Sequence, residues 1–204
     1  MTSKAISRSA MLLGLAGAVV VALVTLAYYL THDAIEESEY QALLVALNSI
    51  IPEDSHDNDL VNDTRPLPAT RELGLKKDAL VYRARKDGKI FAAAFPVTAP
   101  DGYNGPINLL MAVDREHRVM GVRVVSHLET PGLGDRIEQR RTDWVDSFRG
   151  KRIGDPPEKL WKVKKDGGVF DQFTGATITP RITVNAIRKA LIYVDQNPGV
   201  FFNE

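Results

Sequence analysis

Residues 161–181 read WKVKKDGGVFDQFTGATITPR. Gly175 frees the backbone and Ala176 is small, so another group can approach the chain closely here. Thr179 and Pro180 are predicted as the N-cap and first residue of a helix. Thr177 then lies just before a helix N-terminus, whose partial positive charge and unpaired N–H groups suit a phosphate. An ordinary helix start with capping threonines explains the same residues, and chemistry alone favours it.

Two segments further upstream are candidates for the same kind of site. Ser126–Arg136 (SHLETPGLGDR) places Leu133 between two glycines, which permits close approach to a flat ligand. It matches neither the dinucleotide-binding nor the P-loop pattern. His127 and Glu129 are not assigned as a catalytic pair, because the pattern offers no third group to orient them. Asp101–Ile107 (DGYNGPI) reads as a tight turn before a strand. A surface turn is the simpler interpretation of both segments.

Alternating apolar residues and turn residues around these segments predict antiparallel hairpins. The expected strands cover residues 79–86, 89–98, 107–113 and 119–125, with a further short strand at 161–165. Helical spacing predicts helices at 35–51, at 137–148 and from Pro180 onward. The last of these carries one apolar face, made of Ile182, Ala186, Ile187, Ala190, Leu191 and Val194. Residues 53–66 are expected to form a polar loop. Hairpin strands with flanking helices indicate an α+β fold.

Residues Ala10–Leu30 contain no charged side chain. This run of about 21 residues would be a helix about 31 Å long, enough to cross a hydrocarbon core of about 30 Å. Lys4 and Arg8 precede it, and acidic residues follow it. The positive-inside rule therefore predicts a cytoplasmic segment at 1–9, a transmembrane helix at 10–30 and an extracytoplasmic domain at 35–204. A cleaved signal peptide would have a shorter apolar region and a better cleavage site.

The composition narrows the function classes. The chain of 204 residues has 26 basic and 26 acidic side chains, so no nucleic-acid partner is expected. It has no cysteine, which excludes disulfides, thiolate metal sites, cysteine-ligated iron–sulfur clusters and a cysteine nucleophile. The four histidines lack the H-x-x-x-H spacing of a zinc site, so no metal site is expected.

The motifs together resemble the G subunit of Rnf (also called Rsx) electron-transport complexes. This G subunit belongs to the FMN-binding domain superfamily, which includes the C subunit of the sodium-pumping NADH:quinone reductase. The matching pieces are the N-terminal anchor, APDGYNGPI at 99–107, HLETPGLGD at 127–135, the 161–181 segment and the closing helix. TGAT alone would be weak, but TGAT after Asp171 with HLETPGLGD upstream is highly specific. The TGATITP form and the KKDGG run favour the Rnf protein over the quinone-reductase one.

The resemblance implies a covalent FMN. In this family a flavin transferase links FMN through a phosphoester to the last threonine of [ST]-G-A-[TS], which is Thr177 here. Asp171 falls in the transferase's recognition sequence, and Glu129–Gly132 falls on a loop that lies near the flavin. The implied cofactor-binding residues are Thr177, Thr174, Gly175, Ala176, Glu129, Thr130, Gly132, Leu133 and Gly134.

The implied function is electron relay without substrate turnover by this chain itself. The chain would sit in the bacterial inner membrane as a single-pass protein, with its domain on the periplasmic side. Its partners would be the other Rnf subunits, the flavin transferase and the lipid bilayer, and the complex would link ferredoxin or NADH oxidation to ion movement. An anchored domain that binds a ligand or partner without redox chemistry is the alternative. A free-standing flavin oxidoreductase would need an acid or base that the sequence does not make evident.

Overall fold

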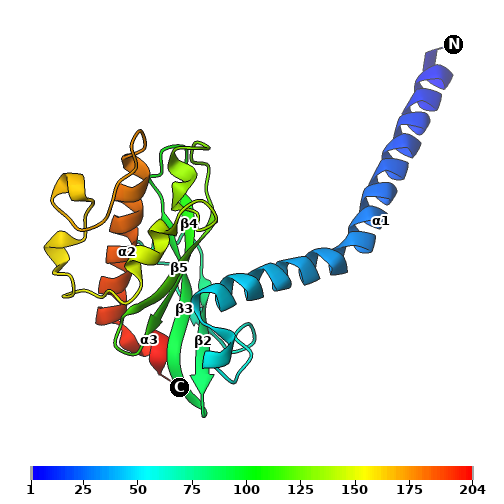
Figure 1. The fold of residues 1–204 in the computed structure, drawn as a ribbon. Coiled ribbons are helices and arrows are strands. Elements are labelled where there is room, and N and C mark those ends of the chain that lie inside the picture. The colour runs from blue at the N-terminus through cyan, green and yellow to red at the C-terminus, as the bar shows by residue number, and fades with distance from the viewer. Residues whose placement is uncertain (1, 204) are drawn as a thin grey trace. The chain divides into compact units, whose positions relative to one another are not determined.

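The computed structural model describes residues 2–203, except for the side chains of residues 2–5, 7, 9, 33, 36 and 39. It divides into two compact units, Met1–Ala42 and Leu43–Glu204, and each is considered by itself. The α+β class predicted from the sequence is confirmed, because an apolar N-terminal helix precedes an antiparallel sheet with flanking helices (Figure 1).

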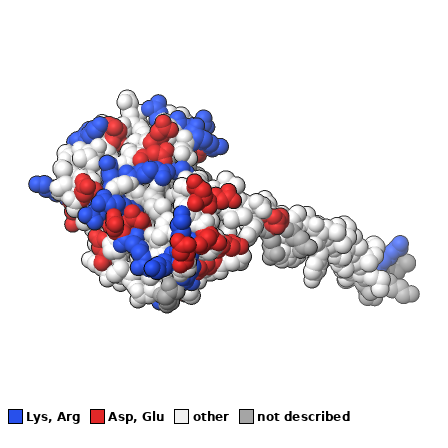
Figure 2. Space-filling view, turned by 60° about the horizontal axis from the view of Figure 1, so that its bottom comes forward, with Lys and Arg blue, Asp and Glu red and all other residues white. Residues whose placement is uncertain are grey.

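Helix α1 runs from Thr2 to Ile50. Its residues up to Ala42 form the first unit, and its last turns, from Leu43, belong to the second. Its segment Ala10–His32 has a mean hydropathy of 2.5 and is the one stretch among the described residues that is long and apolar enough to cross a membrane. In Figure 2 the described side chains along this helix are mostly uncharged, whereas acidic and basic side chains intermix over the second unit. The helix expected separately at 35–51 is the C-terminal part of α1.

The second unit is built on a five-stranded antiparallel sheet in which every strand pairs with its neighbour along the chain. The strands are β1 (Thr64–Leu67), β2 (Ala79–Lys86), β3 (Lys89–Ala99), β4 (Ile107–Asp114) and β5 (Val119–Ser126). Four of them were predicted to within one residue at each end. The β2–β3 turn has Asp87 at φ 51° and Gly88 at φ 73°, as a two-residue hairpin loop with two positive φ angles requires.

Apolar side chains cover both faces of this sheet. One face packs against α2 (Ile178–Gln196) and α3 (Pro198–Phe202), and Figure 1 shows α2 along that side. The apolar face predicted for the helix from Pro180 onward, which is α2, is buried, and only Ile182 is partly exposed. The other face is lined by small alanines and receives Leu47, Ile50, Ile51 and Leu60. Gly121 permits this contact, because an added Cβ would lie 2.9 Å from the Ile50 side chain.

The helix predicted at 137–148 is wrong. Two short 3-10 helices, Gly134–Ile137 and Asp143–Phe148, lie there instead, separated by a turn. Thr142 interrupts the segment, because its hydroxyl donates to Arg136 O at 2.7 Å and accepts from Trp144 N at 3.3 Å. The apolar spacing arises because Trp144 and Phe148 enter an aromatic cluster, and not from a continuous helix.

The short strand predicted at 161–165 is also wrong. The chain forms 3-10 turns at Glu158–Leu160 and Lys164–Asp166, with one isolated bridge between Val163 and Phe170. Trp161 is buried, and its indole donates to Pro156 O at 3.1 Å. The backbone N–H and C=O groups of this segment are therefore paired within a tight loop and not along the edge of a sheet.

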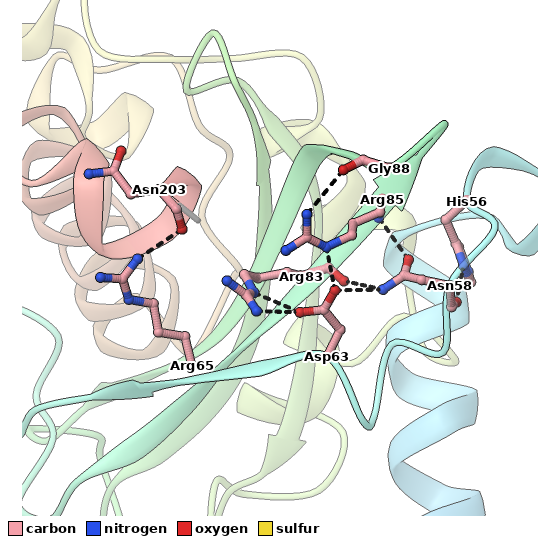
Figure 3. Close-up of polar contacts among 8 residues, drawn as sticks. All are labelled: His56, Asn58, Asp63, Arg65, Arg83, Arg85, Gly88 and Asn203. Atoms are coloured by element: carbon pink, nitrogen blue, oxygen red, sulfur yellow. Dashed lines mark hydrogen bonds and ion pairs between the residues drawn. The ribbon is translucent and has the colours of Figure 1, made fainter.

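The polar segment 53–66 is partly a strand. It contains the 3-10 turn Glu53–Ser55 and ends in β1, which pairs with β2. Asp63 accepts hydrogen bonds from Arg83 Nε at 2.8 Å and Arg85 Nε at 2.6 Å, and Asn58 bonds the β2 backbone (Figure 3). These side-chain contacts with β2 hold a segment that has no apolar periodicity.

Candidate functional site

A hollow of about 460 Å³ lies where the three candidate segments of the sequence meet. This volume is within the range of small-molecule and cofactor sites, about 300–1,000 Å³. The hollow is lined by Tyr103, Glu129, Thr130, Leu133, Gly134, Gly175, Ala176, Thr177, Ile178 and Thr179. Seven of the nine sequence-predicted site residues are among them, whereas Thr174 and Gly132 lie outside the lining.

The TGAT loop is a tight turn built on an aromatic base. Ala176 N donates to Phe173 O at 3.2 Å, and Gly175 has φ +83°, the positive angle that the third residue of a type II turn needs. Phe173 is buried against Trp144, with ring centroids 5.3 Å apart. The Trp144 indole donates to Asp171 O at 2.8 Å. The turn therefore rests on buried aromatic side chains on one side, and its other side faces the hollow.

Thr177 stands at the start of α2 with its hydroxyl unused by the helix. It occupies the N-cap position at φ −76° and ψ −27°, and its side chain makes no capping hydrogen bond. The first N–H groups of an α-helix have no partner within the helix, and they attract negative charge. A half-buried hydroxyl at this place suits a phosphoester.

The prediction that Thr179 caps the helix is wrong. The helix begins at Ile178, so Thr179 lies inside the first turn and only 1% of it is exposed. Its hydroxyl donates to Glu129 Oε2, and its carbonyl accepts from Thr183 Oγ1 at 2.8 Å. Pro180 is the third helical residue, not the first. Its missing N–H costs little there, because the first turn has no intrahelical acceptor for it.

The loop Glu129–Gly134 forms the wall opposite the TGAT turn. Thr130 O accepts from Leu133 N at 3.1 Å and Gly134 N at 3.0 Å, and Gly132 has φ +77°. Gly134 is packed tightly, because an added Cβ would lie 2.8 Å from Glu129 Cβ. The Asn104 amide donates to Thr130 Oγ1 at 3.4 Å, which joins the 101–107 segment to this wall.

His127 and Glu129 have structural contacts in this wall. Glu129 N donates to His127 Nδ1 at 3.0 Å, so the other ring nitrogen carries the proton and donates to Glu138 Oε1 at 2.8 Å. Arg140, and then His127, hold the pKa of Glu138 below its ordinary value. Glu129 is 5% exposed, and its Oε1 is buried without a hydrogen-bond partner among the described residues. Glu138 thus supplies a partner that orients His127, which the sequence pattern did not show, while the other ring nitrogen is occupied by the Glu129 backbone N–H.

Sequence reasoning missed three lining residues. Tyr103 and Ile178 are 65% and 44% exposed at the hollow, beside Leu133 at 40%. The DGYNGPI turn was a signal for Tyr103, but exposed apolar side chains such as Ile178 carry no sequence signal of their own. The third missed residue is the buried Thr179.

The residues of this hollow fit FMN. The Thr177 hydroxyl can carry a phosphoester, the helix N-terminus favours its charge, and Tyr103, Leu133 and Ile178 offer apolar surface to a flat ring. Within the described residues, no group of three or more His, Asp or Glu side chains could hold a metal ion.

A larger hollow of about 670 Å³ lies between α2 and residues 158–166. It contains none of the predicted cofactor residues. Two ion pairs join its sides, Arg181 to Asp166 at 2.6 Å and Arg188 to Glu158 at 2.7 Å. The candidate cofactor site is thus the smaller of the two hollows, because that one is lined by Thr177.

Comparison with known proteins identifies the family. The FMN-binding domain profile matches residues 102–192, and the profile of the RnfG N-terminal region matches residues 1–50. The chain is 47% identical to the G subunit of the ion-translocating oxidoreductase complex of Pseudomonas aeruginosa, over 96% of this chain and 92% of that protein. The corresponding G subunits of Vibrio atlanticus and Shewanella loihica are 44% and 42% identical, over 95% and 98% of this chain and 92% and 94% of their own lengths. The hollow formed by the TGAT turn and the ETPGLG loop thus lies in an FMN-binding domain, and the chain belongs to the family of ion-translocating oxidoreductase complex G subunits.

Proposed function

We propose that this chain is a membrane-anchored flavoprotein that relays electrons within an Rnf-type ion-translocating complex, with FMN attached covalently to Thr177. The observation that carries the proposal is the free Thr177 hydroxyl at a helix N-terminus, inside a hollow of cofactor size. Membership in the G-subunit family supports the redox role.

The choice among the three threonines of the loop rests on their contacts. Thr179 is buried and its hydroxyl is engaged with Glu129. Thr174 is exposed and lies outside the lining of the hollow. Thr177 lines the hollow, and its side chain makes no capping hydrogen bond. It is therefore the threonine on which a flavin phosphate would be both accessible and electrostatically stabilised.

The remaining roles follow from the same hollow. Bound FMN supplies reversible electron transfer, and the protein holds and shields it and sets its local field. Gly175 and Ala176 leave room at the attachment point, Leu133 and Tyr103 cover apolar ring surface, and Thr130 and Gly134 shape the opposite wall. The chain then acts as a relay, without substrate turnover of its own.

The anchoring and maturation steps complete the proposal. Residues 10–30 span the inner membrane once, residues 1–9 remain cytoplasmic and residues 35–204 form the periplasmic domain. The uncharged segment Ala10–His32 supports this, together with the basic residues that precede it. The flavin transferase recognises Asp171, whose exposed carboxylate is held by Lys164 Nζ at 2.6 Å. The other members of the complex are the electron-transfer partners.

Denaturing gels under ultraviolet light test the covalent link, because only an attached flavin survives denaturation. Thr177→Ala is expected to abolish the fluorescent band of the full chain, and the matched variant Thr174→Ala is expected to keep it. Peptide mass mapping assigns the modified residue. FMN found on Thr174 or Thr179, or a fluorescent Thr177→Ala protein, contradicts the assignment.

Protease added to intact spheroplasts tests the topology separately. We expect digestion of residues 35–204 and survival of the N-terminal fragment. A fully protected domain would show that the chain has the opposite orientation.

A further inference from the structure

The hollow of about 670 Å³ between α2 and residues 158–166 carries an excess of positive charge. Its charged side chains are four cations and two anions, namely Lys159, Lys162, Arg181, Arg188, Glu158 and Asp166. Both anions are already paired with the two arginines. Lys159 and Lys162 are exposed, and neither belongs to the ion pairs Arg181–Asp166 and Arg188–Glu158. Lys162 lies near Asp166 and, after Arg181, helps to lower the pKa of that carboxyl. The hollow therefore carries two more cations than anions, which favours an anionic group.

The two ion pairs make this hollow a fixed groove. Asp166 accepts two hydrogen bonds from the Arg181 guanidinium, at 2.6 and 2.8 Å. Arg188 forms an ion pair with Glu158 and also donates to Asn185 Oδ1 at 2.9 Å. The Asn185 amide nitrogen therefore points away from Arg188. Arg181 and Arg188 lie two helical turns apart, roughly 10 Å along the axis, so the groove is held at both ends.

The groove runs in line with the flavin attachment point. Arg181, Asn185 and Arg188 recur at helical spacing on one face of α2, and Thr177 is the N-cap residue four positions before Arg181. The other side of the groove, residues 158–166, is joined to Asp171 by the ion pair of Lys164. A protein that binds Asp171 and acts on Thr177 therefore meets the groove next to them.

We propose that this groove, defined by Lys159, Lys162, Arg181 and Arg188, is the docking surface for an acidic segment of the flavin transferase. This inference rests on the proposed attachment of FMN to Thr177. An electron-transfer partner has no comparable reason to lie here, because the hollow that fits the flavin ring opens at Tyr103, Leu133 and Ile178. Lysines that face an acidic surface of a partner raise the rate at which the two proteins meet and fix the orientation in which they bind.

The reaction that reports docking is the transfer of an FMN unit from flavin adenine dinucleotide. The bond between the Thr177 oxygen and the flavin-side phosphorus forms, the pyrophosphate bond of the dinucleotide breaks, and AMP leaves. The hydroxyl proton passes to solvent, and no oxidation or reduction occurs. The fluorescence of covalently attached flavin, measured over time, therefore reports the rate of productive encounters between the two proteins.

The test uses the full chain in detergent without flavin, the transferase and the dinucleotide. The variant Lys159→Glu/Lys162→Glu reverses the charges of these two lysines, and Lys86→Glu/Lys89→Glu makes the same charge change on the exposed β2–β3 turn. For the groove variant we expect KM for the protein acceptor to rise about tenfold with kcat nearly unchanged. The wild-type KM should also rise with salt, and the turn variant should resemble the wild type. Circular dichroism confirms that both variants fold.

The outcomes separate this inference from the function on which it rests. An unchanged KM in the groove variant, with wild type labelled and Thr177→Ala unlabelled, overturns docking and leaves the proposed function standing. An equal rise in both variants shows general charge attraction and also overturns it. Groove-dependent thermal stabilisation by pyrophosphate, with KM unchanged, would assign a small-anion site instead. Absence of any label on wild type would contradict the covalent flavin itself.

Discussion

Gly132 and Gly134 lie two residues apart in the loop Glu129–Gly134, and the structure requires a glycine at each for a different reason. Gly132 has φ +77°, and nothing lies within 4 Å of a Cβ added there. Gly134 has no such angle, but an added Cβ would lie 2.8 Å from Glu129 Cβ and Oε2 and 2.9 Å from Thr179 Oγ1. Backbone conformation therefore limits substitution at position 132, and space limits it at position 134.

Alanine should destabilise the domain at both positions. At Gly134 the three contacts are shorter than normal non-bonded separations of about 3.5–4.0 Å, and overpacking of this kind costs about 1–3 kcal/mol. At about 2–4 °C per kcal/mol for a domain of this size, the melting temperature should fall by about 2–12 °C. At Gly132 the left-handed conformation costs an L-residue about 1–2 kcal/mol.

Asparagine separates the two causes, because it tolerates the left-handed region better than alanine and is larger. Gly132→Asn should be more stable than Gly132→Ala, whereas Gly134→Asn should be less stable than Gly134→Ala. Near-ultraviolet circular dichroism of the full chain in detergent measures the transition through its two tryptophans, Trp144 and Trp161. The same order of alanine and asparagine at both positions would refute the reasoning.

Two further predictions concern polar contacts away from the hollow lined by Thr177. Asp63→Asn removes the carboxylate shared by Arg83 and Arg85. The free energy of unfolding, measured by urea titration, should fall by about 1–3 kcal/mol. An unchanged free energy of unfolding would show that the two ion pairs add nothing to stability. The pKa of Glu138 is lowered by Arg140 and then by His127, so its stabilising contribution exists above the unfolded-state pKa and disappears as pH falls through the lower native pKa. Arg140→Gln should therefore move acid unfolding to higher pH, and a transition at the same pH would contradict this.

Local patterns were sufficient for the hairpin strands but not for the segments held by distant contacts. β2 to β5 alternate and are joined by recognisable turns, so their bounds could be predicted. β1 contains Pro66, and it forms a strand because β2 pairs with it and Asp63 binds Arg83 and Arg85. Likewise, Thr142 and the aromatic packing of Trp144 divide a segment whose apolar spacing indicated one helix.

The start of α2 shows how one distant contact changes the interpretation of a motif. Pro180 suggested a helix beginning at that residue, because proline is favoured at the first helical position, but it is also tolerated throughout the first turn. The contact between Thr179 and Glu129 joins residues 50 positions apart, which no local pattern can predict. Because that contact occupies the Thr179 hydroxyl, Thr179 does not serve as the cap, and the helix begins at Ile178 with Thr177 before it. The interaction that corrects the helix start is therefore also the one that supports Thr177, and not Thr179, as the flavin acceptor.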